Sequence, residues 1–326
     1  MGWRYGLAFF LLCFTIWGSL ALFYQVQASV WVRGLVIASY VLLSLFLLYS
    51  WVAGHHSGRL LAFGLLNIAL LGWWFTIQPT GDKDWAADVQ YTTTGQVNGN
   101  HVTLEHVRNF VWHNRDQATP QWETRHYDLS QLQTVDMFLS YWMGPAIAHT
   151  LVSFGFADGQ QVVWSVEIRR QVQQKFSSIG GFFKSFEMSV IAADENDIIR
   201  LRTNHRREEV YRYPIDMPLE SAQSLFIAYV ELANDTAQHP RFYHTLFANC
   251  TTIVYQLASR IVKGLPKDYR LLLSGYLPSY LQKLGALAGP ERPLTVRQHE
   301  AAISAKAQAI PPHAPYSEWI RQTDSP

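Results

Sequence analysis

Residues 148–167 read AHTLVSFGFADGQQVVWSVE, two runs rich in β-branched and aromatic side chains on either side of an Asp-Gly turn. This pattern predicts two antiparallel strands joined as a hairpin. A two-residue loop would place Phe156 opposite Gln161 and would mix apolar and polar side chains on each face. A three-residue loop ending in Gly159, as a left-handed bulge residue, places Phe156 opposite Gln160 and keeps one face apolar. We expect the second register.

In that register one face of the hairpin is apolar and the other brings two ionisable residues together. The apolar face comprises Val152, Phe154, Phe156, Val162, Trp164 and Val166. On the opposite face His149 lies directly across from Glu167. A carboxylate beside an imidazole fixes its tautomer and stabilises the imidazolium, so His149 is a candidate base and Glu167 its orienting acid. The alternative is that His149 caps a loop and Glu167 pairs with Arg169 or Arg170.

A second chemical candidate lies farther along the chain, in the stretch 242–252 (FYHTLFANCTT), which leads into an apolar helical run. Asn249 resembles a helix N-cap, which puts Cys250 in the first turn. There the helix dipole and the free N–H groups favour a thiolate and can receive an oxyanion. Cys250 is therefore the candidate nucleophile, and a buried inert thiol is the alternative.

Other residues compete with these candidates or support them. His244, six residues before Cys250, is the rival base, and His126 is a third choice. The supporting candidates are Asn249, Thr251, Arg169, Tyr243 and His244. A charged cluster with Arg200, Arg202, Arg206 and Arg207 is interpreted as a solvated face, with contact to lipid headgroups as the alternative.

Motifs of other chemistries are absent from the sequence. It holds no HExxH, no CxxC, no glycine-rich phosphate loop and no GxSxG. We therefore expect no metal site, no cofactor and no serine nucleophile elbow.

The elements around the hairpin predict an α+β domain. Strand patterns occur at 88–94, 100–108, 123–129, 149–156, 160–168, 187–193 and 197–202. Helical periodicity follows at 219–237 and 249–262, with shorter helical pieces at 268–287. One domain over 81–290 fits this order, and the Pro- and Ala-rich tail at 291–326 is expected to be loosely ordered.

The first part of the chain differs from the rest in its content of charged residues. The first 81 residues contain no Asp, Glu or Lys and only three Arg, whereas the remaining 245 carry all 25 acidic side chains. Residues 5–24, 34–53 and 60–77 are uncharged and about long enough to cross a bilayer core of roughly 30 Å. We predict three transmembrane helices in a membrane domain at 1–80. A signal peptide, or buried helices of a soluble protein, are the alternatives.

The charges flanking these spans indicate an orientation. Arg4 precedes the first span, and Arg59 lies with His55 and His56 between the second and third. By the positive-inside rule the N-terminus is cytoplasmic, although Arg33 lies beside the first outer loop. Three spans then place the domain after residue 81 outside the cytoplasm, in the periplasm if the membrane is a bacterial inner membrane.

Charge and cysteine content exclude several classes of protein. A net charge of +1 argues against a nucleic-acid partner, and two cysteines argue against a disulfide-stapled module. Cys13 lies inside the first span and cannot pair with Cys250 beyond it. Cys250 is thus a single thiol in the extracytoplasmic domain.

Several strings together resemble the Lnb N-terminal periplasmic domain family. They are NHVTLEHVRNF at 100–110, the hairpin at 148–167, DENDIIRLR at 194–202, EVYRY at 209–213 and HPRFYHTLFANCTT at 239–252. The resemblance covers roughly residues 85–290 and implies a papain-like cysteine-enzyme fold in a permuted, NlpC-type order, with His before Cys. It implies lipoprotein N-acyl transfer as the activity.

The family's residues carry over by position. The cysteine of NCTT falls on Cys250, the histidine of HTxxSF on His149 and the acid of SVExR on Glu167, in agreement with the choice made from the residues alone. Two departures concern the substrate: His244 stands where the family usually has Asn, and the membrane segments precede the domain rather than follow it.

These observations predict a membrane-anchored acyltransferase that works through a Cys250 thioester. The expected donor is a phospholipid or a lipoprotein diacylglyceryl group, and the acceptor is an amine such as a lipoprotein N-terminus. We expect an apolar groove near Cys250 that faces the membrane lipids. The alternatives are a cysteine peptidase or amidase of cell-envelope peptides, and a non-enzymatic membrane-anchored binding module with His149 far from an inaccessible Cys250.

Overall fold

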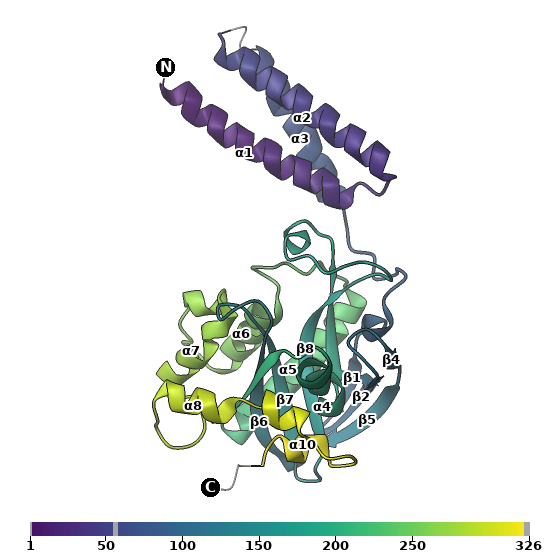
Figure 1. Ribbon diagram of the computed structural model, residues 1–326, viewed down its shortest axis with the longest axis vertical. Coiled ribbons are helices and arrows are strands. Elements are labelled where there is room, and N and C mark those ends of the chain that lie inside the picture. Colours follow the sequence, from purple (N-terminus) through teal and green to yellow (C-terminus); the bar gives the residue numbers. More distant parts are fainter. Residues whose placement is uncertain (1, 55–57, 323–326) are drawn as a thin grey trace. The chain divides into compact units, whose positions relative to one another are not determined.

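The computed structural model describes residues 2–54 and 58–322 (Figure 1). The chain divides into two compact units, one made of residues 1–80 with 176–186 and the other of residues 81–175 with 187–326. His55 and His56, which entered the orientation argument, lie outside the described residues.

Three long helices form most of the first unit: α1 (Gly2–Gln25), α2 (Val30–Val52) and α3 (Gly58–Thr76). All three are long and apolar enough to cross a membrane, which confirms the three predicted spans. The hydroxyl of Tyr40 on α2 donates to Oδ1 of Asn67 on α3 at 2.8 Å, a buried polar contact between helices. Each helix satisfies its own backbone groups, as a span must in lipid.

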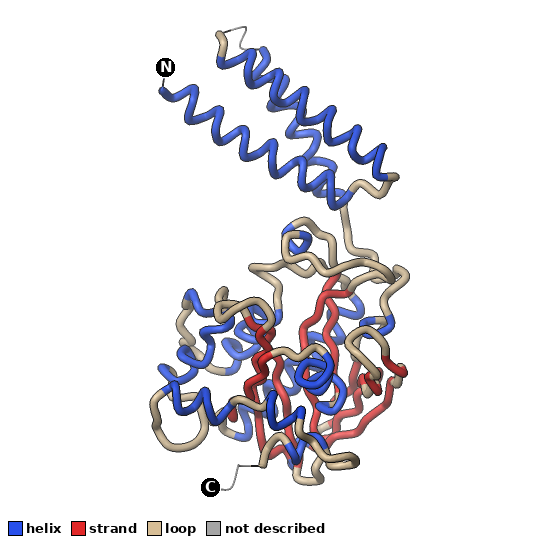
Figure 2. Tube along the Cα trace, viewed as in Figure 1, coloured by secondary structure: helices blue, strands red, loops and turns tan. Residues whose placement is uncertain are grey.

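A mostly antiparallel sheet is the centre of the second unit (Figure 2). Its strands run in the order β1-β2-β9-β8-β7-β6-β10, with β5 paired to β2. A separate ribbon joins β3 (Val111–Trp112) and β4 (Ala118–Thr119). The strands of the main sheet are β1 (Thr94–Asn98), β2 (His101–Arg108), β5 (Trp122–Asp128), β6 (Leu132–Tyr141), β7 (Ala148–Phe156), β8 (Gln161–Arg169), β9 (Glu187–Ala193) and β10 (Glu209–Pro214).

The β7–β8 hairpin has the predicted register. Phe154 lies opposite Val162, and the N–H of Phe156 donates to the carbonyl oxygen of Gln160 at 3.0 Å. Gly159 adopts φ +87°, the left-handed conformation that the bulge position requires. The six residues of the predicted apolar face all lie in one buried cluster. The apolar face therefore sets the register, as expected.

Helices cover both faces of the sheet (Figure 1). α5 (Leu219–Gln238) and α6 (Cys250–Ile261) pack on the apolar face of the hairpin. α4 (Glu195–Arg200), α9 (Ser304–Gln308) and α10 (Tyr316–Trp319) pack on the other face. A third cluster joins α7 (Leu277–Lys283) and the end of α8 (Leu294–Ala301) to the β6 and β10 edge. The α+β prediction is confirmed.

Two predicted strands are wrong. Residues 88–94 begin with a 3₁₀ turn, Ala87–Val89, and extended pairing starts only at Thr94. Residues 197–202 are helical, because the Asp194 side chain caps α4 by accepting from the N–H of Asn196. α4 then continues into a π-helical turn, η4 (Leu201–His205).

The expectation of a loosely ordered tail is also wrong for the described residues. After Gly289 the chain forms α8, α9 and α10, and Ile303, Tyr316 and Ile320 are buried against the sheet. Arg321 then donates to Glu195 at 2.6 Å and to Asp136 at 2.8 Å. Sparse apolar anchors and one ion-pair network hold this segment despite its Pro and Ala content.

Candidate active site

Cys250 is the first residue of α6, as predicted. Oδ1 of Asn249 accepts from the N–H groups of Thr251 and Thr252, each at 2.9 Å, and Thr252 Oγ1 accepts from the N–H of Asn249 in return. This reciprocal capping box fixes the helix start at Cys250. The cysteine is 7% exposed and its side chain belongs to the core between α6 and the sheet.

The thiol lies at the end of the β7–β8 ladder. Paired residues run from Gly155 opposite Gln161 to Leu151 opposite Ser165. One residue beyond, the N–H of Thr150 donates to Sγ of Cys250 at 3.5 Å. The thiol therefore lies beside the residue that follows His149 in β7.

His149, the neighbour of Thr150 in β7, contacts a carboxylate. Its Nε2 lies 3.1 Å from Oε1 of Glu167 and 2.9 Å from Oγ of Ser165, whose hydroxyl donates to the same carboxylate oxygen at 2.7 Å. The hydroxyl proton points to Glu167, so Nε2 is the protonated nitrogen that donates to both partners. The charges of His149 and Cys250 act on each other's pKa, and with Nε2 engaged by Glu167 and Ser165, Nδ1 is the ring nitrogen left for the thiol.

Arg202 completes this arrangement and was not chosen from the sequence. Its Nη2 donates to Oε1 of Glu167 at 3.0 Å, and its Nη1 donates to the carbonyl oxygen of Ile198 at 3.1 Å. Arg202 is 4% exposed, so the interpretation of its cluster as a solvated face is wrong at this position. It lies in η4, and π-helical turns are frequent at functional sites. We call Cys250, His149, Ser165, Glu167 and Arg202 the cysteine site.

Charges within the cysteine site favour the ionised pair. Burial opposes charge on His149, but the negative charges of Glu167 and Cys250 outweigh it and raise the His149 pKa to about 9. Burial raises the pKa of the Cys250 thiol, and the facing imidazolium outweighs this and lowers it below its ordinary value. Despite its burial, Glu167 has a pKa well below its usual range, because His149 and Arg202 hold it ionised. The charges of the site thus stabilise the thiolate and the imidazolium together.

Two supporting candidates lie next to the thiol. Thr251 Oγ1 lies 3.9 Å from Sγ of Cys250 and 2.9 Å from Oγ1 of Thr150. Tyr243 packs against the buried cluster that contains Cys250. Burial and the charges of Cys250 and Glu167 raise the Tyr243 pKa well above its ordinary value, so this phenol stays protonated.

The remaining predicted residues have other contacts. Nδ1 of His244 accepts from the N–H groups of Leu246 and Phe247, which leaves that nitrogen occupied in its own turn. Arg169 donates to the carbonyl oxygens of Val89 and Gln90. His126 bonds Thr103 on an exposed part of the sheet, and Arg170 pairs with Asp88. None of these contacts involves Cys250 or Glu167.

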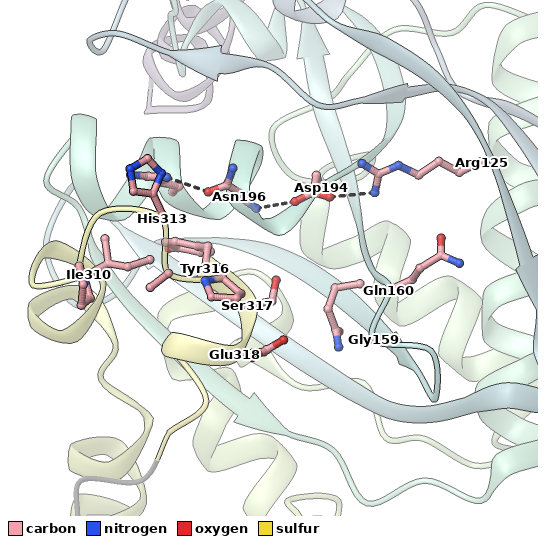
Figure 3. Close-up of a pocket in the computed structure, with 15 residues that line it drawn as sticks. Arg125, Gly159, Gln160, Asp194, Asn196, Ile310, His313, Tyr316, Ser317 and Glu318 are labelled. Carbon is pink, nitrogen blue, oxygen red and sulfur yellow. Dashed lines mark hydrogen bonds and ion pairs between the residues drawn. The ribbon is translucent and has the colours of Figure 1, made fainter.

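A hollow of about 680 Å³ lies elsewhere in the second unit (Figure 3). It is lined by residues such as Arg125, Asp194 and His313, and Arg125 pairs with Asp194 at 2.8 Å. No residue of the cysteine site is among its lining residues. Within residues 2–54 and 58–322, no group of three or more His, Cys, Asp or Glu side chains is placed to hold a metal ion.

Comparison with known proteins agrees with the resemblance drawn from the motifs. The model of the Lnb N-terminal periplasmic domain family matches residues 118–275. This segment contains all five residues of the cysteine site. No curated protein and no solved structure matches the chain.

Proposed function

We propose that this protein is a membrane-anchored cysteine acyltransferase that transfers an acyl chain from a lipid ester to an amine. One observation carries the proposal: a thiol at a helix N-terminus accepts from the N–H of Thr150, and the adjacent residue, His149, is held through Nε2 by Glu167. This is the arrangement of a nucleophile, a base and an orienting acid. His149 on a strand and Cys250 on a helix, in that chain order, support a permuted papain-like fold.

The first half-reaction follows from the protonation of the pair. The Cys250 thiolate attacks the ester carbonyl carbon of a phospholipid or a diacylglyceryl group, and the carbonyl oxygen becomes an oxyanion. When the C–O bond breaks, Nδ1 of the His149 imidazolium gives its proton to the leaving alkoxide. The products are an acyl thioester on Cys250, a free alcohol and a neutral imidazole.

The second half-reaction returns the enzyme to its starting state. An amine, such as a lipoprotein N-terminus, attacks the thioester carbonyl while Nδ1 of His149 takes the proton from nitrogen. The C–S bond breaks, an amide forms, and the thiolate faces an imidazolium again. Glu167 and Arg202 keep Nε2 in place through both steps.

The oxyanion has two donors in this scheme. The N–H groups of Thr251 and Thr252 are engaged by the Asn249 cap, so the first helical turn offers the N–H of Cys250. The protonated phenol of Tyr243, which packs against the cluster that contains Cys250, supplies the second donor.

The membrane unit gives this chemistry a physical setting. Acyl donors are concentrated in lipid, and three spanning helices keep the domain at the membrane surface. With Arg4 and Arg59 on the cytoplasmic side, the domain lies in the periplasm, on the inner membrane of a bacterium. The expected apolar groove near Cys250 belongs to this proposal, because a thioester must be shielded from water.

An amine-acylation assay tests the proposal. The full chain is placed in phospholipid vesicles with a diacylglyceryl lipopeptide that has a free α-amine, and products are identified by mass spectrometry. We expect N-acyl lipopeptide with the native chain and none with Cys250→Ser or with an N-acetylated lipopeptide. Release of free fatty acid without amide indicates the hydrolase alternative, and equal amide formation by Cys250→Ser contradicts cysteine chemistry.

A further inference from the structure

The loop at 176–186 (FSSIGGFFKSF) lies between β8 and β9, yet it belongs to the first unit, together with the three apolar helices. The chain leaves the second unit after Lys175 and re-enters it at Glu187. The sequence pattern gave this segment no role, and the cysteine site does not use it.

Polar contacts join the loop to two helix ends. Tyr24 Oη lies 3.1 Å from Ser177 Oγ, and Gln25 Nε2 donates to the carbonyl oxygen of Phe183 at 2.5 Å. Nζ of Lys184 donates to the carbonyl oxygens of Trp74 and Ile77, at 2.8 Å and 3.0 Å. These two carbonyls lie at the end of α3 and directly after it, so the Lys184 ammonium caps the C-terminus of the helix.

Ring contacts reinforce this attachment. Phe183 stacks on Tyr24 with ring centroids 5.5 Å apart and meets Trp74 edge-on at 6.3 Å. The Lys184 ammonium lies 4.9 Å from the centre of the Trp74 ring. Because both polar and aromatic contacts fix residues 183 and 184, the rest of the loop is held at the same helix ends.

A bilayer-spanning α1 places these helix ends at the level of the lipid headgroups. α1 has 24 residues, so it is about 36 Å long at 1.5 Å per residue and exceeds a hydrocarbon core of about 30 Å. Its last turn, with Tyr24 and Gln25, therefore reaches the interface. Trp73 and Trp74 at the end of α3 are the residue type enriched at that depth.

The loop presents apolar side chains at this depth. Phe176 and Ile179 are each 56% exposed, and Phe182 is exposed as well. Apolar side chains beside a cation and at headgroup level are typical of interfacial membrane anchors. We propose that residues 176–182 insert into the boundary between headgroups and acyl chains, with Phe176 and Ile179 in contact with lipid.

Depth measurement in vesicles tests this loop. A fluorescent NBD label is attached to Ile179→Cys in a full-length Cys13→Ser/Cys250→Ser background, reconstituted in phosphatidylcholine vesicles. We expect blue-shifted emission, strong quenching by a phospholipid with a shallow nitroxide, and several-fold weaker quenching by aqueous iodide than for the control. Val111→Cys on β3, 54% exposed and outside the loop, is the matched control and should show the opposite pattern.

The result does not depend on catalysis, because Cys250 is absent from the labelled protein. Phe176→Cys, labelled in the same way, is the second reporter in case the first substitution disturbs the loop. If both loop labels are quenched by iodide as strongly as the Val111→Cys label, the loop lies in water and the proposal is wrong. Lipid contact with no amine acylation would overturn only the proposed enzyme activity.

Discussion

Nη2 of Arg202 donates to the same carboxylate oxygen of Glu167 that faces His149, at 3.0 Å. A buried guanidinium on η4 and an imidazole on β7 thus share one acceptor on β8. The carboxylate is ionised because it is paired on both sides, and it holds the imidazolium in turn. The His149 pKa should therefore shift in opposite directions when Glu167 and when Arg202 is replaced.

Replacement of Glu167 by Gln should lower the pH at which the pair of Cys250 thiolate and His149 imidazolium is lost. The native pair is lost as pH rises through the His149 pKa of about 9. Without the negative charge of Glu167 that pKa falls, so the imidazolium deprotonates at lower pH and the thiolate loses its partner. Titration of the ultraviolet thiolate absorbance, relative to Cys250→Ser, measures the change. We expect amine acylation to fall about 10²-fold or more, and an unchanged alkaline limit would rule out this role for Glu167.

Replacement of Arg202 by Met should raise the pH at which the thiolate–imidazolium pair is lost, which is the alkaline limit of the pair. Arg202 lowers the His149 pKa by charge repulsion, so its loss raises that pKa. The same change leaves a buried carboxylate with one partner fewer and should reduce the free energy of unfolding by about 3 kcal/mol. Thermal unfolding and the thiolate titration measure both effects. Arg202→Lys keeps the charge and should restore the native alkaline limit, which a merely space-filling role for Arg202 does not predict.

Replacement of Tyr243 by Phe removes one proposed oxyanion donor. The phenol is protonated at neutral pH and carries no charge to the thiolate. We expect kcat for amine acylation to fall by about 10²-fold while the thiolate titration stays close to native. A shifted titration with native kcat would place Tyr243 in the electrostatics of the thiol rather than in oxyanion binding.

Replacement of Asn249 by Ala removes the helix cap beside the nucleophile. The N–H groups of Thr251 and Thr252 lose their acceptor, so the free energy of unfolding should fall by about 1 kcal/mol. Asn249→Asp keeps the acceptor and should retain most of this stability. Its added negative charge should raise the thiol pKa, so denaturant unfolding and thiolate titration separate the two roles. Equal stability of the native protein and Asn249→Ala would show that the cap does not hold α6.

Much of the cysteine site could be predicted because local signals determine it. Alternation along 148–167 gives the register that puts His149 across from Glu167, and the Asn249 cap starts α6 at Cys250. Both signals depend only on residues that are close together in the sequence. The three spans follow from composition alone, since uncharged runs of this length have one favourable environment.

Arg202 was missed because its position depends on the helical form of residues 195–205. Ile198 and Ile199 are β-branched and Leu201 is apolar, so this run was interpreted as a strand. Asp194 was therefore not recognised as a helix N-cap. Four arginines within eight residues also suggested a solvated face. In the structure Ile198, Ile199 and Leu201 are buried and the π-helical turn brings Arg202 to Glu167. Asp194 as an N-cap before an apolar run was the signal that would have revealed this helix.

The central claim is that Cys250 carries the acyl group as a thioester, and intact-protein mass spectrometry tests it most directly. The full chain is incubated with phospholipid vesicles in the absence of an amine acceptor, and its mass is recorded before and after treatment with hydroxylamine. The account predicts an added mass of one acyl chain on Cys250 that hydroxylamine removes and that Cys250→Ser lacks. An unmodified Cys250 after this incubation, in a preparation that forms N-acyl lipopeptide once the acceptor is added, would contradict it.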